Sequence, residues 1–237
     1  GALLQRAEAI YGVPAEIIVA IIGVETSYGQ NTGNFSVLEA LASLAFDYPP
    51  RAEFFRSELE NFLLLARENG DDPLAIQGSY AGAMGIPQFM PSSQRNYAVD
   101  FDGDGRVDLR HSTADAIGSV ARYLQKYGWQ KGAPVAVPAR VDGDPAALLA
   151  AGIKPALTVE ELSARGVFMV RPGSDDTQRT AALIDLETPG RQTEYWLGFE
   201  NFYVITRYNR SSFYAMSVFQ LAEVVREVRH NRLAATR

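Results

Sequence analysis

VPAEIIVAIIGVETSYG, residues 13–29, predicts the helix around which the rest of the chain folds. Pro14 suits the start of a helix, where its missing N–H would have been unpaired in any case. Every residue from Ile17 to Val24 is apolar or glycine, and a helix that is apolar on all sides belongs inside a core. Glu25 follows this run directly, and the polar residues after it indicate that the helix ends at a cleft.

Glu25 has two interpretations. An ionised carboxylate is costly to bury, so a glutamate in apolar sequence is paired, partly solvated or held protonated. The protonated form would be a general acid at neutral pH. The alternative is an ordinary glutamate at a helix C-terminus that faces solvent or pairs with an arginine. Both interpretations stay open on this stretch alone.

The composition is that of a globular protein. Apolar residues make up 47% of the 237 residues, and the net charge of −6 argues against a nucleic-acid partner. No apolar run approaches the roughly 20 residues that span a bilayer. The chain has no cysteine, which excludes disulfides and thiolate chemistry. Its first residues read like the middle of a helix, so we expect a truncated or processed N-terminus.

The pattern along the chain predicts a helical domain with an inserted mixed segment. Ser36 and Glu39 form a capping-box pattern at the start of one helix. Apolar spacing and end signals predict the helices at residues 1–11, 36–46, 51–69, 113–127 and about 211–229. Between residues 130 and 200, glycine and proline separate four short strands, APVAVPARV, FMVRP, ALIDLE and TEYWLGF, and two short helices, PAALLAAG and VEELSARG. The predicted organisation is a core at 1–130, an inserted subdomain at 131–200, and a return to the core at 201–237.

QGSYAGAMGIPQFMPSSQ, residues 77–94, is dominated by small residues and proline. Small residues let backbone approach backbone or a ligand closely. One interpretation is a tight packing corner between helices. The other is a cleft wall into which Ser79, Tyr80, Gln88 and Met90 project.

DFDGDGRVDLRHSTAD, residues 100–115, matches most of an EF-hand calcium loop. Aspartates occupy loop positions 1, 3, 5 and 9, and Gly105 at position 6 permits the sharp turn. Carboxylates this close repel one another without a cation, although a solvated acidic turn is the alternative. The expected Ca²⁺ ligands are carboxylates and one backbone carbonyl, from Asp100, Asp102, Asp104, Arg106 (carbonyl), Asp108 and Asp115.

Position 12 of this loop departs from the motif. His111 stands where an EF-hand carries a bidentate glutamate, and imidazole is a poor ligand for a hard cation. Asp115, at the start of the next predicted helix, is the expected substitute. The loop is then longer than standard, which leaves its affinity open. We read His111 and His230 as surface residues.

Four blocks of sequence together resemble the lytic transglycosylase B family of bacterial murein-cleaving enzymes. They are GVETSYG around Glu25, GSYAGAMGIPQFMPSS at 78–93, DFDGDGRVDL with DAIGSVARYL, and FYVITRYNRSSFYAMSVFQLAE at 202–223. The resemblance covers nearly the whole chain, and four blocks in order are more specific than any one. It implies a mainly α (α+β) fold with a lysozyme-like helical core, an EF-hand-like calcium loop and a small inserted mixed subdomain.

The resemblance also implies a reaction. The β-1,4 bond between N-acetylmuramic acid (MurNAc) and N-acetylglucosamine (GlcNAc) is broken without hydrolysis, which leaves a 1,6-anhydro-MurNAc end. One glutamate, here Glu25, acts first as acid and then as base. The substrate's acetamido group replaces the second carboxylate that ordinary glycosidases use. The resemblance implies structural Ca²⁺ and no organic cofactor.

By motif, the resemblance assigns substrate-binding roles to further residues. Ser79 and Gln88 would bind the N-acetyl group and nearby sugar atoms. The remaining assignments are Tyr123, Tyr208, Asn209 and Tyr214 along the groove, with Arg51 as partner of a stem-peptide carboxylate. The expected partners are peptidoglycan glycan strands and cell-wall synthesis or remodelling proteins, not nucleic acid, and the expected state is a monomer. The expected location is the periplasm, soluble or lipid-anchored to the outer membrane.

Two rival functions remain at this point. A muramidase would hydrolyse the same bond with a positioned water and a second carboxylate, and would leave reducing ends. A non-catalytic protein would bind peptidoglycan or calcium without cleavage.

Overall fold

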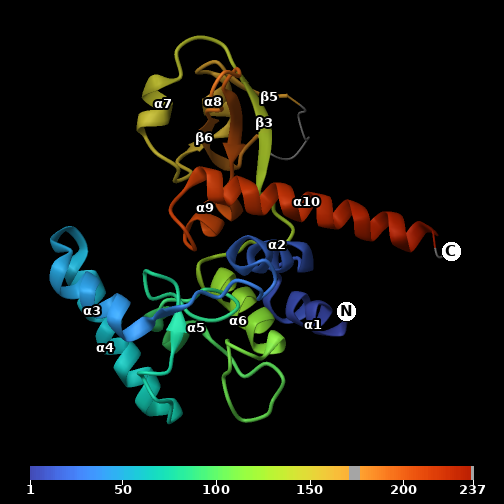
Figure 1. Ribbon diagram of the computed structural model, residues 1–237. Coiled ribbons are helices and arrows are strands. Elements are labelled where there is room, and N and C mark those ends of the chain that lie inside the picture. Colours follow the sequence, from blue (N-terminus) through green and yellow to red (C-terminus); the bar gives the residue numbers. More distant parts are fainter. Residues whose placement is uncertain (171–176, 236–237) are drawn as a thin grey trace. The chain divides into compact units, whose positions relative to one another are not determined.

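The computed structural model describes residues 1–170 and 177–235 (Figure 1). The chain divides into two compact units, Gly1–Lys126 and Tyr127–Arg237. Among the described residues, no single helix is long and apolar enough to cross a membrane. The pair α1 (Ala2–Tyr11) and α2 (Ala15–Thr26) passes that test of length and composition together, bent by 110° at their junction.

The first unit is helical, as the apolar spacing predicted. Its helices are α1 (Ala2–Tyr11), α2 (Ala15–Thr26), α3 (Val37–Asp47), α4 (Ala52–Asn69), α5 (Pro91–Tyr97) and α6 (Thr113–Lys126), with a 3₁₀ turn at Pro49–Arg51. One of the two bonds of the capping box predicted for α3 is present, since the Ser36 hydroxyl accepts the Glu39 N–H at 3.3 Å. The two-residue strands β1 (Phe35–Ser36) and β2 (Gln77–Gly78) pair antiparallel, which ties the loop after α2 to the loop after α4.

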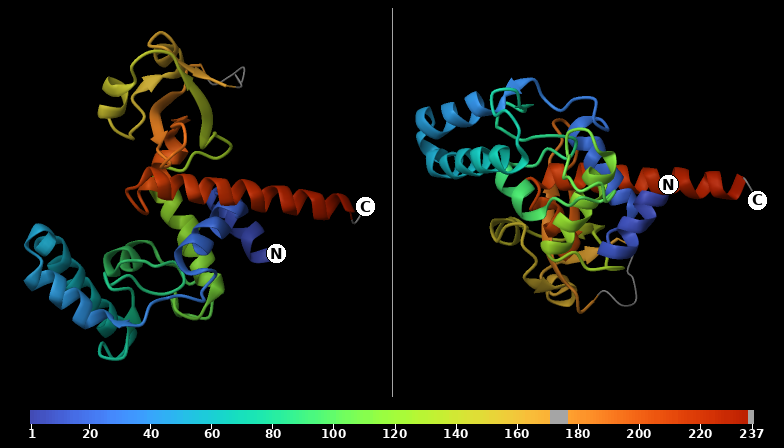
Figure 2. Two further views of the ribbon diagram at one scale, coloured as in Figure 1. Left: turned by 45° about the horizontal axis from the view of Figure 1, so that its top comes forward. Right: turned by 90° about the horizontal axis from the view of Figure 1, so that it is seen from below.

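Two groups of helices build this unit. α3 and α4 lie side by side around a buried apolar cluster that includes Leu41 and Phe62 (Figures 1 and 2). α1, α2 and α6 pack together as the second group. α2 has the buried residues expected of a core helix, but Val24 is 38% exposed because the last turn emerges at the surface. α2 also begins at Ala15, with Pro14 as its N-cap instead of its first helical residue.

The second unit contains a five-stranded antiparallel sheet in the order β4-β6-β7-β3-β5. Its strands are β3 (Ala136–Val141), β4 (Leu157–Thr158), β5 (Val167–Met169), β6 (Thr180–Leu186) and β7 (Glu194–Gly198). The short helices α7 (Ala146–Ala150) and α8 (Val159–Ser163) contribute Leu148, Leu149, Val159 and Leu162 to the core on one face. The four strands and two helices predicted for this segment are confirmed, although the end of the FMVRP segment lies outside the described residues.

The other face of the sheet is covered by the last two helices, α9 (Glu200–Thr206) and α10 (Ser212–Ala235). A Cβ on Gly198 would lie 2.8 Å from the Phe202 ring, so glycine lets α9 approach β7. Trp196 of β7 meets Phe219 of α10 edge to face, with ring centroids 6.3 Å apart. The predicted last helix is confirmed and runs further than expected, to Ala235.

Asn201 joins the two ends of the segment predicted as an insertion. Its buried side-chain amide accepts the Gln130 N–H at 2.8 Å and donates to the carbonyls of Gln130 and Ala133, both at 2.9 Å. The segment therefore leaves and returns at one point. The first unit ends at Lys126, close to the predicted boundary. The return of residues 201–237 to the helical core stays a prediction.

Candidate active site

Glu25 lies in the last turn of α2, directly before an abrupt helix end. The Ser27 N–H bonds to the Gly23 carbonyl at 2.9 Å, and the Tyr28 N–H to the Ile22 carbonyl at 3.3 Å. These bonds close the C-terminus of α2 through residues in the left-handed conformation, a position that helices usually give to glycine. Here Ser27 and Tyr28 adopt φ of 50° and 62°. Non-glycine residues in this region are strained, and such strain gathers at functional sites.

The Glu25 side chain is half-buried, between exposed Val24 and buried Thr26. Tyr28 folds back along the helix, since a Cβ on Gly23 would lie 2.9 Å from its ring. Glu25 is therefore neither enclosed in the core nor fully solvated. That it holds a proton at neutral pH stays a prediction.

Two hydrogen bonds tie the segment after Glu25 to the loop at 85–88. The Thr26 hydroxyl donates to the Ile86 carbonyl at 2.8 Å. The Gln88 side-chain N–H₂ donates to the carbonyls of Thr32 at 3.0 Å and Gly85 at 2.9 Å. Gln88 has a φ of 50°, another left-handed non-glycine residue. Glu25 and Gln88 thus lie on segments that hold each other in place.

The bonds of Gln88 determine which chemistry it can offer. Two carbonyl partners fix the nitrogen end of the amide, because only N–H₂ can donate to them. Within the described residues its half-buried Oε1 accepts no hydrogen bond. Gln88 can therefore present an acceptor to a ligand N–H or O–H.

Ser79 has a structural task in the same loop. Its Oγ accepts the N–H groups of Ala81 at 3.3 Å and Ala83 at 3.0 Å, which closes a turn. Only its hydroxyl hydrogen is left to donate to a ligand. Tyr80, next along the chain, is exposed, whereas Met90 packs against the α3–α4 cluster.

The glycines of the 77–94 loop serve close backbone packing. A Cβ on Gly78 would lie 2.3 Å from the Ala83 carbonyl oxygen, and a Cβ on Gly85 would lie 2.5 Å from that of Leu109. No real side chain fits at such distances. These glycines therefore serve close packing of loop backbones, and the cleft-wall interpretation of Ser79, Tyr80 and Gln88 stays a prediction.

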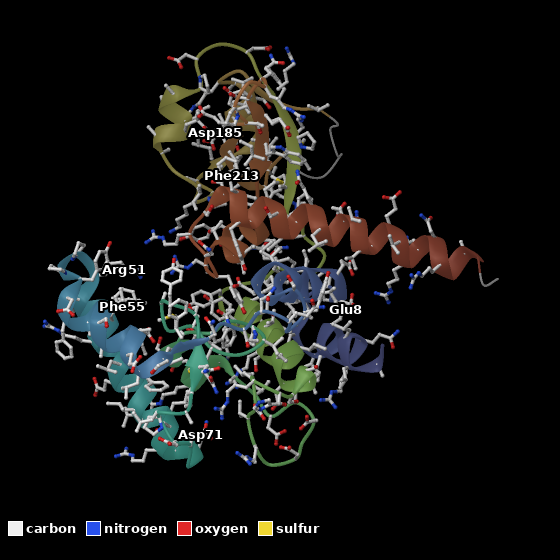
Figure 3. The ribbon with its side chains drawn as sticks, in the orientation of Figure 1. Glu8, Arg51, Phe55, Asp71, Asp185 and Phe213 are labelled. Carbon is white, nitrogen blue, oxygen red and sulfur yellow. The ribbon has the colours of Figure 1, made fainter. Side chains whose placement is uncertain are left out.

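Tyr123 of α6 is only 5% exposed. Its ring lies between those of Phe89 and Tyr97, with centroid distances of 5.5 and 5.1 Å. Tyr123 therefore offers no open ring face, and its expected groove-lining role stays a prediction. Arg51 precedes α4 and is exposed; its guanidinium lies 4.4 Å from the Phe54 ring and 5.1 Å from the Phe55 ring (Figure 3).

The other expected groove residues lie together in the second unit, at the turn between α9 and α10. The rings of Tyr208 and Tyr214 stack with centroids 6.4 Å apart. The exposed Asn209 carbonyl accepts the Ser211 N–H at 2.7 Å. These residues form one cluster, and their pairing with Glu25 stays a prediction.

Three carboxylates of the expected calcium loop come together. Ligand atoms of Asp100, Asp102 and Asp115 lie within 4.8 Å of one another. Asp115 is buried at the start of α6 and accepts the N–H groups of Phe101 at 2.7 Å and Asp108 at 2.8 Å. Hydrogen bonds from backbone N–H groups, above all that of Gly105, hold the pKa of Asp100 below its usual value. This convergence agrees with Asp115 as the substitute for position 12.

The remaining expected ligands are engaged locally. Asp104 Oδ1 accepts the Arg106 N–H at 2.8 Å. Asp108 accepts the N–H groups of Arg110 and His111, both at 3.0 Å, and its Oδ2 lies 2.9 Å from the His111 ring nitrogen Nδ1. Burial opposes the charge on Asp108, yet the His111 contacts lower its pKa overall. His111 itself is exposed, as predicted. Asp104, Asp108 and the Arg106 carbonyl as ligands stay predictions.

A family model described as "Transglycosylase SLT domain" matches residues 1–223. The chain belongs to this family. Over 222 residues it is 50% identical to the membrane-bound lytic murein transglycosylase B of Escherichia coli (strain K12), which covers 94% of this chain. The SLT-domain chain spans about 60% of the length of that curated relative.

Solved structures of related proteins match the SLT-domain chain closely. It is 52% identical to the soluble lytic transglycosylase SltB1 from Pseudomonas aeruginosa, with a TM-score of 0.87 over 97% of this chain and 75% of the other. The E. coli lytic transglycosylase SLT35 in complex with calcium is 48% identical, with a TM-score of 0.83 over 96% and 71%. SltB3 from P. aeruginosa in complex with NAG-anhNAM-pentapeptide is 36% identical, with a TM-score of 0.80 over 93% and 58%. The expected mainly helical, lysozyme-like fold class is confirmed.

Two features of the SLT-domain site were missed in the sequence. Thr26 reads there as one of several polar residues that end a helix, yet it is a buried hydrogen-bonding centre. Glu58 reads as a charge between apolar positions of α4, yet it is buried and binds the Ser92 N–H at 2.9 Å and hydroxyl at 2.6 Å. Glu58 thereby anchors the chain just after Gln88. Neither contact has a signal in local sequence, because both partners lie far along the chain.

Proposed function

We propose that this chain is a lytic murein transglycosylase that cleaves the β-1,4 MurNAc–GlcNAc bond of peptidoglycan without hydrolysis. The sequence identity of 50% over 222 residues to a lytic murein transglycosylase carries this assignment. The position of Glu25 supports it, because a half-buried carboxyl on a strained helix end is reachable by substrate yet shielded on one side. The NAG-anhNAM-pentapeptide bound by SltB3 has the anhydro sugar expected of such a product.

Glu25 would perform both proton transfers. In the first, its carboxyl donates a proton to the glycosidic oxygen as the bond from that oxygen to the muramyl C1 breaks. The neighbouring acetamido oxygen stabilises C1. In the second, the Glu25 carboxylate takes the proton of the muramyl C6 hydroxyl while that oxygen bonds to C1. Glu25 regains its proton, GlcNAc leaves with a free hydroxyl, and no water is consumed.

The polar groups proposed to bind substrate suit an N-acetylated sugar. The Gln88 Oε1 can accept an acetamido N–H or a hydroxyl, because its N–H₂ is committed to backbone carbonyls. The Ser79 hydroxyl can donate to a sugar oxygen. Tyr123, Tyr208, Asn209 and Tyr214 are proposed as further groove residues, and tyrosine provides both a flat apolar face and a hydroxyl for sugars. Arg51 is proposed as the partner of a stem-peptide carboxylate.

The loop at 100–115 is proposed to bind structural Ca²⁺. The donor set fits, since hard cations take oxygen ligands and three carboxylates converge there. SLT35, related over most of the chain, was solved in complex with calcium. The proposed location is the periplasm, where peptidoglycan strands and the proteins that build or remodel them would be the partners. The proposed state is a monomer, without an organic cofactor.

The decisive experiment is product analysis of intact murein by mass spectrometry, with the chain and its Glu25→Gln variant. We expect 1,6-anhydro-muramyl ends from the chain and a loss of at least about 10³-fold in rate from the variant, because Gln cannot exchange a proton. The variant should still bind murein. Reducing ends would instead indicate a muramidase, and binding without cleavage a non-catalytic protein; either result refutes the proposal.

A further inference from the structure

We propose that Thr26 is a positioning residue whose buried hydroxyl fixes the position of Glu25 relative to the loop that carries Gln88. This inference rests on the proposed function, because it concerns the reaction assigned to Glu25. It adds a residue that has no direct part in the proton transfers.

Thr26 connects three segments of the first unit through one oxygen. The side chain is 1% exposed. Its O–H donates to the Ile86 carbonyl at 2.8 Å, with the Ile22 carbonyl of α2 at 3.3 Å. Its Oγ1 also accepts the Gly29 N–H at 2.9 Å. Helix α2, the turn that ends it and the backbone of the 85–88 loop therefore meet at this hydroxyl.

The turn after Thr26 needs such an anchor. Ser27, Tyr28 and Gly29 all have positive φ, at 50°, 62° and 87°. Left-handed conformations at non-glycine residues persist only where the surroundings determine them. The Thr26 bond to Gly29 closes this turn, and the bond to Ile86 fixes the turn to its neighbour. Because Glu25 is adjacent in the chain, the same bonds set where its carboxyl projects.

The Gln88 contact makes the connection mutual. Gln88 donates to the Thr32 carbonyl, so the segment after Glu25 is tied to the 85–88 loop at two points six residues apart. Two such points define both distance and direction between the segments. A shift at Thr26 would therefore move the Glu25 carboxyl relative to Gln88 Oε1, the proposed acceptor for the acetamido N–H.

Valine matches the shape of threonine but cannot form these bonds. In Thr26→Val the Ile86 carbonyl and the Gly29 N–H lose their partner in a buried place, so the turn must rearrange to satisfy them. A misplacement of about 1 Å between reacting groups costs about 100-fold in rate. We therefore expect kcat to fall by about 100-fold with little change in KM, whereas Thr26→Ser keeps the hydroxyl and most of the rate.

The experiment measures kcat and KM on soluble glycan strands, and melting curves, for the parent chain and four variants. Thr26→Val and Thr26→Ser test the hydroxyl. Leu65→Ala is the stability control, because it opens a cavity in the α3–α4 core and should lower the melting temperature at least as much. Glu25→Gln tests the proposed function itself. All rates are taken at a temperature where each variant is folded.

The inference is supported if Thr26→Val loses about 100-fold in kcat while Thr26→Ser and Leu65→Ala stay within about threefold of the parent chain. It is overturned if Thr26→Val keeps its kcat, if Thr26→Ser loses as much as Thr26→Val, or if Leu65→Ala loses as much. An active Glu25→Gln variant would instead refute the proposed function. The experiment therefore distinguishes failure of the Thr26 inference from failure of the proposed function. Should Thr26→Val fail to fold, Thr26→Ala replaces it in the same comparison.

Discussion

Asp115→Ala tests whether the acidic loop binds calcium and whether Asp115 completes it. Asp115 is 1% exposed, and its two carboxylate oxygens accept the N–H groups of Phe101 and Asp108. Alanine leaves both N–H groups without an acceptor, at about 1–3 kcal/mol each, of which entering water restores part. We expect a loss of about 2–4 kcal/mol even in chelator, or about 4–16 °C in melting temperature.

Calcium adds a second, separable effect. At a free concentration 100 times the Kd, a ligand that binds only the folded state stabilises it by about 2.7 kcal/mol. The parent chain should therefore melt about 5–11 °C higher in calcium than in chelator. Asp115→Ala should show no such difference, because it removes one of the three carboxylates that converge.

Asp104→Ala is the matched comparison for Asp115→Ala. Asp104 is exposed, and its side chain accepts one backbone N–H, so in chelator the variant should lose less than about 1 kcal/mol. In calcium it should still lose the melting shift if Asp104 is a ligand. Thermal melting by circular dichroism measures the parent chain and both variants, each in calcium and in chelator. A parent chain that melts identically in calcium and chelator, or an Asp115→Ala variant with the full calcium shift, would refute the reasoning.

Two further predictions concern stability. Gly85→Ala should cost about 3 kcal/mol or more, because its φ is +71° and a Cβ would lie 2.5 Å from the Leu109 carbonyl oxygen. Gly132→Ala, at φ +76° with nothing within 4 Å, should cost only about 1 kcal/mol in urea unfolding, and equal losses would contradict the clash. The backbone N–H and hydroxyl of Thr158 hold the pKa of Glu161 below its usual 4.5. A lowered folded pKa means that this stabilisation is complete above pH 4.5 and is lost as pH falls below it. Glu161→Gln should therefore lower the melting temperature at pH 7 but not near pH 2, and an equal effect at both would refute the assignment.

Much of the helical fold follows from spacing and end signals, and the misses have physical causes. The run from Ile17 to Val24 predicts a core helix because a helix that is buried on all sides needs apolar residues on every face. α9 was not predicted, since its residues ENFYVIT are rich in aromatic and β-branched types that favour strands. Its helix depends on burial of Phe202, Val204 and Ile205, which is tertiary packing overriding local preference.

The candidate site was predicted by residue type more than by geometry. Glu25 stands out because a carboxyl directly follows an apolar run. The left-handed turn at Ser27 and Tyr28 could not be foreseen, because serine and tyrosine rarely adopt that conformation. In the acidic loop, spacing indicates which residues come near a cation. It does not reveal that Asp104 and Asp108 also bind local N–H groups, a competition that depends on loop conformation.

The Asn201 amide determines which parts of the second unit could be changed in length without disturbing the rest. The Asn201 side chain bonds to Gln130 and Ala133, so the segment that carries the strands begins and ends at the same place. Its two ends are therefore held together whatever the length of chain between them. Closing a longer loop costs only slightly more chain entropy, about 0.6 kcal/mol for each doubling. We therefore expect that the loops between these strands can be lengthened at little cost in stability, provided that the packed strands and helices are kept, while the Asn201 junction retains its bonds.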